Sequence, residues 1–212
     1  MQAEIDRRTL VLGLSGLAFA GPVVAAEGPL VPTPGQTEGP FYPVSLPADR
    51  DHDLVRVEGA AARALGRVLH LEGRVLDRRG RPLPEAMVEI WQCDAHGVYR
   101  HPRAPGQERA DPGFQGYGRT LVGPEGAFRF RTIRPVPYPG RTPHIHVAVV
   151  VPGTGRLVSQ LYVAGEPLNE RDALFRSIRD PAARARVLME LVDGSALEPE
   201  ALATRVDLVL DL

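Results

Sequence analysis

A His-x-His pattern at residues 144–146 is the first feature of this sequence that could do chemistry. His144 and His146 lie in a β-branched run bounded by prolines, which predicts a strand. Side chains two residues apart in a strand point to the same face, so both imidazoles can bind one metal ion. Taken alone, the pattern leaves a polar strand face as the alternative.

Two tyrosines occupy positions from which they could complete a ligand set. Tyr138 precedes the histidines in a loop stiffened by three prolines, and Tyr99 lies in a turn after a predicted strand. Phenolate is a hard, anionic ligand, and its free pKa of about 10 means that only a strongly polarising ion keeps it ionised at neutral pH. Two phenolates with two neutral imidazoles favour Fe(III) over Fe(II), zinc or Cu(I). Ordinary packing with a hydrogen-bonded hydroxyl is the alternative for both tyrosines.

Short strands separated by turns are the elements that must position these residues. The 22 Gly and 21 Pro in 212 residues indicate many turns. An Asp180-Pro181 start signal predicts one helix, with Ala182–Leu191 following it. Together the patterns predict an all-β fold, an antiparallel β-sandwich with one or two short helices near the C-terminus. The predicted strands are His70–Leu76, Met87–Gln92, Arg119–Val122, Ala127–Arg131, His144–Val151, Leu157–Val163 and Val206–Leu210.

The first 26 residues are typical of an export signal. Arg7 and Arg8 precede a mild apolar stretch that contains glycines, and small residues follow at a cleavage position, as in a twin-arginine signal. An N-terminal membrane anchor is the alternative. We expect a signal at 1–26, an extended arm at 27–66 and a catalytic β-sandwich at 67–212. The mature protein is expected to be periplasmic or extracellular, with no later apolar run long enough to cross a membrane.

Composition excludes several function classes. All 25 basic residues are arginines, which excludes Schiff-base lysine chemistry and the phosphate-binding lysine of P-loops. The formal net charge of −1 gives no electrostatic reason to expect a nucleic-acid partner. A single cysteine, Cys93, excludes an intrachain disulfide and all-cysteine metal sites.

From residue 37 to the C-terminus, an ordered series of motifs resembles the intradiol ring-cleavage dioxygenases, and most closely the protocatechuate 3,4-dioxygenase type. Each motif is weak alone, and their order makes the resemblance specific. The motifs are Thr37-Glu38-Gly39-Pro40-Phe41, Val88-Glu89-Ile90-Trp91-Gln92, Gly97-Val98-Tyr99-Arg100-His101, Asp111-Pro112-Gly113-Phe114, Phe130–Pro135, Tyr138-Pro139, Arg141–His146 and Gln160-Leu161-Tyr162.

The resemblance implies a non-haem Fe(III) enzyme that cleaves catecholic rings with O2 to muconate-type products in aromatic compound catabolism. It implies that Arg141 stabilises charge on the bound catechol, that Gln160 lies beside the substrate and iron, and that Tyr138 takes part in removing a catechol proton. The partners are then a small catecholic substrate and O2. Whether the protein forms a homo-oligomer is left open. The implied metal ligands are Tyr99, Tyr138, His144 and His146.

The sequence also departs from the family, and other interpretations stay open. Only Pro139 and Gly140 separate Tyr138 from Arg141, where the family has a longer insert, so we expect an open pocket that does not require protocatechuate. The residues from 73 to 84 also resemble the opening of metal-free β-sandwich binding modules, which is the rival function. Two histidines that flank Tyr99 could be rival ligands, although turn or pocket-rim positions are favoured: His96 and His101.

Overall fold

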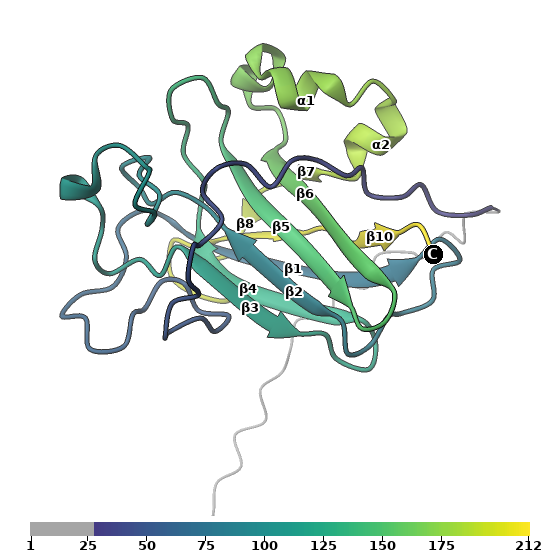
Figure 1. Ribbon diagram of the computed structural model, residues 1–212, viewed down its shortest axis with the longest axis horizontal. Helices are drawn as coiled ribbons and strands as arrows, with labels where there is room; N and C mark the ends of the chain where they lie inside the picture. Colours follow the sequence, from purple (N-terminus) through teal and green to yellow (C-terminus); the bar gives the residue numbers. More distant parts are fainter. Residues whose placement is uncertain (1–27) are drawn as a thin grey trace, which may run out of the picture.

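The computed structural model describes residues 28–212 (Figure 1). The expected export signal at 1–26 lies outside the described residues, so that interpretation stays a prediction. Within residues 28–212, no helix is long and apolar enough to cross a membrane.

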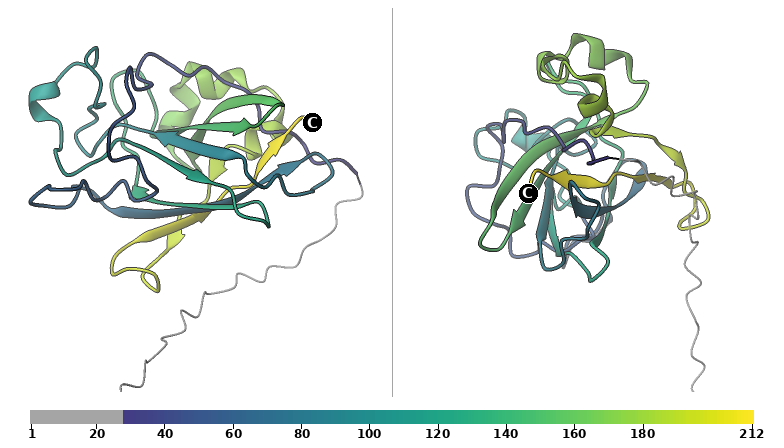
Figure 2. Two further views of the ribbon diagram at one scale, coloured as in Figure 1. Left: turned by 60° about the horizontal axis from the view of Figure 1, so that its bottom comes forward. Right: turned by 90° about the vertical axis from the view of Figure 1, so that its right-hand side faces the viewer.

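Two five-stranded sheets face each other (Figures 1 and 2). The first consists of β1 (Val68–Asp77), β4 (Ala127–Ile133), β8 (Val192–Asp193), β9 (Leu202–Arg205) and β10 (Leu208–Leu210). The second consists of β2 (Met87–Trp91), β3 (Tyr117–Leu121), β5 (His144–Val151), β6 (Gly155–Val163) and β7 (Leu188–Met189). Its order is β3-β2-β5-β6-β7, while in the first sheet β1 pairs with β4, β9 and β10, and β8 extends β9.

The two sheets enclose one main hydrophobic core. Alternate residues of the strands contribute fully buried side chains, among them Leu69 and Leu71 of β1 and Ile145 and Val147 of β5. The predicted all-β sandwich is therefore confirmed. Its long strand pairs are antiparallel as expected, whereas β1 pairs in parallel with β9 and β10, and β6 with β7.

The helices are short and lie late in the chain, but the predicted helix has the wrong length. Helix α2 (Pro181–Ala185) begins at the expected proline, where the Asp180 carboxylate accepts a hydrogen bond from Ala182 N. It then ends, because the next residues complete the edge of the second sheet as β7. Pairing with β6 therefore overrides the helical periodicity. A second helix, α1 (Ala173–Ser177), agrees with the predicted one or two short helices, although its position was not predicted, and it follows the 3-10 helix η2 (Pro167–Arg171).

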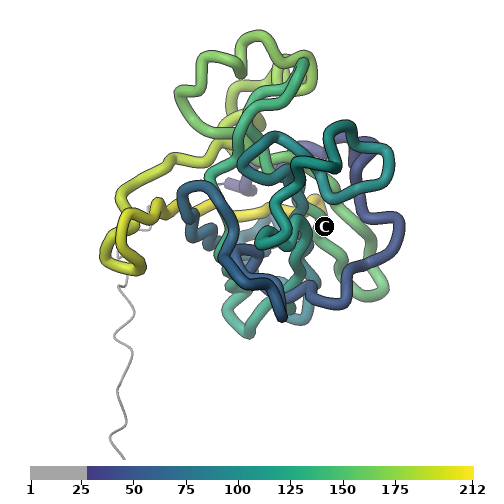
Figure 3. The backbone as a smooth tube through the Cα atoms, turned by 90° about the vertical axis from the view of Figure 1, so that its left-hand side faces the viewer, coloured from purple at the N-terminus to yellow at the C-terminus, as the bar shows by residue number. Residues whose placement is uncertain are grey.

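The N-terminal arm is extended and belongs to the packed structure. Residues 28–66 contain no helix and no strand, and their first part, drawn in purple, crosses the outside of β5 and β6 (Figure 1). Gln36 N donates to Val158 O, and Ser159 Oγ donates to Pro34 O. Further along, Leu54 is fully buried in the main core. The arm thus brings Phe41 against Tyr99 and Tyr42 against Trp91. These contacts lie at the end of the sandwich where the long loops gather (Figure 3), and one of these loops contains the 3-10 helix η1 (Gln107–Arg109).

Candidate metal centre

His144 lies at the first position of β5, with its ring fixed by the backbone. Its Nδ1 lies 2.6 Å from Thr142 O, so Nδ1–H donates to this carbonyl and the lone pair lies on Nε2. Burial, with a smaller contribution from the nearby Arg141 charge, lowers the pKa of His144 to about 4. The imidazole is therefore neutral at neutral pH and offers Nε2 as a donor to a metal ion.

His146 shares the face of β5 with His144, as the period of the strand predicts. The two Nε2 atoms lie 3.3 Å apart, and the His146 ring stacks on Trp91 with centroids 4.9 Å apart and planes at 8°. Burial, the His144 ring and Arg141 hold the pKa of His146 well below its usual value. Its Nδ1 is buried and has no hydrogen-bond partner among the described residues.

Tyr99 reaches the same point from a tight turn. Asp94 organises this turn, because its carboxylate accepts hydrogen bonds from His96 N and Val98 N. Gly97 has a φ of 74°, and an added Cβ would come within 3.2 Å of Pro137 O. The Tyr99 hydroxyl lies 3.4 Å from His144 Nε2, and burial raises the pKa of Tyr99 well above its usual value. Only a strongly polarising ion would ionise this phenol.

Tyr138 and Arg141 are the ends of a β-turn. Arg141 N donates to Tyr138 O at 2.9 Å, with Pro139 as the second residue and Gly140, at a φ of 82°, as the third. Proline followed by a residue of positive φ is the signature of a type II turn. The two-residue spacer noted in the sequence therefore brings Arg141 directly beside Tyr138. Pro139 and Gly140 are both exposed, so no insert covers this side of the site.

The Arg141 guanidinium is held by three side chains. Nη2 donates to Gln160 Oε1 at 2.6 Å, Nε donates to Asp172 Oδ2 at 2.8 Å, and Nη1 lies 3.4 Å from the Tyr138 hydroxyl oxygen. Burial raises the pKa of Tyr138, and the Arg141 charge opposes this shift. Fully buried Gln160 also donates to Thr37 O, which ties the arm to the site.

The spacing of these donors fits one bound metal ion. Metal–nitrogen bonds are about 2.0–2.1 Å long, so two ligands of one ion stand about 3 Å or slightly more apart. The contacts of 3.3 Å and 3.4 Å made by His144 Nε2 match that spacing. Within residues 28–212, no three His, Cys, Asp or Glu side chains gather at one point, so the tyrosines are needed to complete a ligand set.

The structure brings together every residue that the sequence analysis proposed for the site. The two rival histidines lie in the turn segments on either side of Tyr99. The His96 side chain is exposed, and buried His101 packs against Phe41 with its Nδ1 accepting from Arg103 N. The sequence analysis did not predict three contacts around the site. Trp91 stacks on His146, Phe41 stacks on Tyr99, and Asp172 accepts a hydrogen bond from Arg141.

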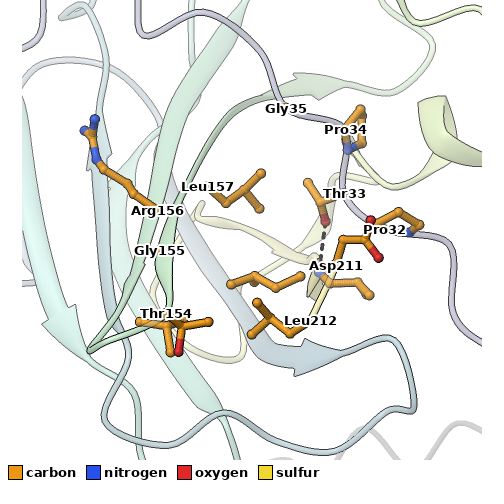
Figure 4. Close-up of a pocket in the computed structure, with 13 residues that line it drawn as sticks. Pro32, Thr33, Pro34, Gly35, Thr154, Gly155, Arg156, Leu157, Asp211 and Leu212 are labelled. Atoms are coloured by element: carbon orange, nitrogen blue, oxygen red, sulfur yellow. Dashed lines mark hydrogen bonds between the residues drawn. The ribbon is translucent and has the colours of Figure 1, made fainter.

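Two cavities help to locate the open side. One, of about 360 Å³, borders Tyr99 and is walled by aromatic side chains, including Phe41, Trp91 and Tyr117. Another, of about 420 Å³, lies between the arm, the β5–β6 hairpin and the C-terminus (Figure 4). None of the proposed ligands or catalytic residues lines this second groove. We therefore assign the chemistry to the end of the sandwich that carries Tyr99 and the first cavity.

Comparisons with known proteins point to one group of enzymes. A family model described as "Dioxygenase" matches residues 37–212. The chain is 35% identical over 193 residues to a protocatechuate 3,4-dioxygenase beta chain from Burkholderia cepacia, covering 86% of this chain and 82% of that protein. It is 29% identical to a catechol 1,2-dioxygenase from Acinetobacter baylyi, of which it spans 56%.

Solved structures agree with this result. The dioxygenase domain of a carbohydrate-binding fusion protein from Streptomyces sp. SirexAA-E matches with a TM-score of 0.67 at 35% identity, covering 86% of this chain and 99% of that domain. A catechol 1,2-dioxygenase from Acinetobacter sp. ADP1 matches with a TM-score of 0.65 at 25% identity, covering 84% of this chain and 62% of that one.

Proposed function

The chain belongs to the intradiol ring-cleavage dioxygenase family, and from this premise we propose that it holds one ferric ion and opens catecholic rings with O2 between their hydroxyl-bearing carbons. The observation that carries the proposal is the convergence of two neutral imidazoles and two phenols at one point of the sandwich. The proposed ligands are Tyr99, Tyr138, His144 and His146.

The substrate class follows from the relatives. These relatives are dioxygenases named for protocatechuate, hydroxyquinol and catechol, which all carry two adjacent hydroxyl groups on an aromatic ring. A bound ferric ion would supply the Lewis acidity that holds such a diol through its oxygens and activates it toward O2. The products would be ring-opened, muconate-type diacids.

The chain's own residues prepare this reaction in three ways. The hydrogen bond to Thr142 O keeps the His144 lone pair on Nε2, where the ion would bind. The Arg141 charge lies beside the Tyr138 hydroxyl and would stabilise negative charge that develops on the diol. The Tyr138 oxygen, with Arg141 beside it, would accept a diol proton.

The short turn before Arg141 bears on substrate choice. Because Pro139 and Gly140 are exposed, they leave room beside Tyr138 and Arg141. We therefore propose that substituted catechols are accepted without a sharp preference for the carboxylated ring. We also propose export by the twin-arginine route, which carries folded proteins and would allow the iron to bind before translocation.

The test combines metal analysis with product identification. Purified protein should be red-brown, contain about one iron per chain, and convert catechol, protocatechuate and a bulkier catechol to ring-opened diacids. A colourless protein that stays colourless and inactive after iron loading would reject the dioxygenase proposal and favour the metal-free binding module. A preference for protocatechuate above roughly 10³-fold in kcat/KM, about 4 kcal/mol, would reject the proposed open pocket but not the dioxygenase activity.

A further inference from the structure

Asp172 is a buried carboxylate that neither the sequence motifs nor the proposed reaction uses. It follows η2 and is the N-cap of α1, and its side chain is fully enclosed. Oδ1 accepts hydrogen bonds from Leu174 N and Phe175 N, which caps the helix. Oδ2 accepts from Arg141 Nε at 2.8 Å and from Thr142 N at 3.0 Å.

We propose that Asp172 is a positioning residue that sets the direction of the Arg141 guanidinium, and so makes it an aligned charge for the dioxygenase reaction. The proposal rests on the proposed function, because the reaction is what the alignment serves. With Nε directed at Asp172 and Nη2 at Gln160, Nη1 is left to face Tyr138. A planar guanidinium held at two edges has little freedom to turn.

The same carboxylate supports the loop that leads to the histidines. By binding Thr142 N it fixes the residue whose carbonyl accepts the His144 Nδ1 hydrogen bond. Thr142 Oγ1 donates to Asn169 Oδ1 in η2, and Asn169 Nδ2 donates to Val163 O at the end of β6. The segment from η2 to α1 therefore holds the 141–144 loop at both its side chains and its backbone.

The charge of Asp172 suits this role. Although burial opposes ionisation, hydrogen bonds from Arg141 and from the backbone lower the pKa of Asp172. It therefore stays ionised and acceptor-only, so each of its four hydrogen bonds has a fixed direction. Protonation would turn one of these oxygens into a donor that faces the N–H groups of either Arg141 or the helix.

The test is a double-mutant cycle. Asp172→Ser keeps a helix-capping oxygen but cannot reach Arg141, and Asp180→Ser makes the same change at the cap of α2, away from the site. If Asp172 acts through Arg141, Asp172→Ser should lower kcat about 10- to 100-fold with little change in KM. The loss in Asp172→Ser/Arg141→Ala should then be clearly smaller than the product of the two single losses, and any excess over Arg141→Ala alone reports the contact with Thr142. Asp180→Ser should keep the wild-type kcat.

A second readout needs neither iron nor turnover. In metal-free protein labelled with nitrogen-15, the Nε–H signal that disappears in Arg141→Ala should be sharp and protected from exchange. It should broaden or move in Asp172→Ser and stay unchanged in Asp180→Ser.

Two results would overturn the positioning role: kcat losses that multiply in the double variant, or an Arg141 signal that is unaffected in Asp172→Ser. Wild-type protein that turns over no catechol would instead reject the proposed function, and the nitrogen-15 signal would still report whether Asp172 holds Arg141.

Discussion

Replacing Arg141 with alanine should reduce turnover far more than it reduces substrate binding. The Arg141 side chain is only 17% exposed, and its Nη1 lies 3.4 Å from the Tyr138 hydroxyl oxygen, near which charge on a reacting diol would develop. An interaction that strengthens as charge develops lowers the barrier, whereas one that is equal before and during reaction lowers only KM. We therefore expect the loss to fall on kcat.

The magnitude follows from the geometry. If a diol oxygen lies as far from Arg141 Nη1 as the Tyr138 oxygen does, 3.4 Å, two unit charges there interact by about 5 kcal/mol at an effective dielectric constant of about 20. The diol gains only part of a unit charge, and the Asp172 carboxylate beside Arg141 opposes the interaction. About 3–4 kcal/mol remains, which corresponds to a fall in kcat of about 10²–10³ and agrees with the loss of one preorganised donor in other active sites.

The assay is steady-state kinetics on catechol, protocatechuate and a bulkier catechol. Arg176→Ala is the matched control, because Arg176 is an exposed arginine in the neighbouring helix α1. Arg141→Lys should recover only part of the activity, since an ammonium cannot bind Asp172 and Gln160 as a planar fork does. Iron content and colour should survive in both Arg141 variants. An Arg141→Ala enzyme with unchanged kcat would refute the catalytic role.

Two further predictions concern the metal and the N-terminus. Tyr99→Phe removes one proposed phenolate ligand, so it should bleach or strongly shift the visible band, while an unchanged spectrum at full iron content would show that Tyr99 is not a ligand. Changing Arg7 and Arg8 to lysine should trap the precursor in the cytoplasm, as measured by fractionation, and normal periplasmic yield would reject the twin-arginine assignment.

The strands could be predicted because their periodicity is visible in the local sequence. The contacts around the site join residues that lie far apart in the chain, so they could not be predicted in this way. The two-residue period placed His144 and His146 on one face of β5. Helix α2 was predicted too long, because nothing local shows that Leu188 and Met189 pair with β6. The turn between Tyr138 and Arg141 could have been predicted, since Pro-Gly at its centre is a type II signal.

Asp172 could not have been recognised as a neighbour of Arg141 from the sequence. It lies 31 residues further along the chain, and its only local signal is that of an N-cap before a short apolar stretch. The stacking of Trp91 on His146 depends in the same way on strand register, because β2 and β5 place these two residues opposite each other. Register is a property of the assembled sheet.

Two buried aspartates explain how loops can hold a site that needs fixed geometry. Asp94 accepts from three backbone N–H groups and fixes the turn that carries Tyr99, while Asp172 fixes the Arg141 side chain and the loop that leads to His144. A carboxylate is suited to this because it accepts up to four hydrogen bonds and donates none. Since the single cysteine allows no disulfide within the chain, these two carboxylates connect the loops where cross-links cannot. Strand β5 places His144 and His146 on one face, whereas Tyr99 and Arg141 lie in loops, so the precision of these two residues depends on the hydrogen bonds of the aspartates.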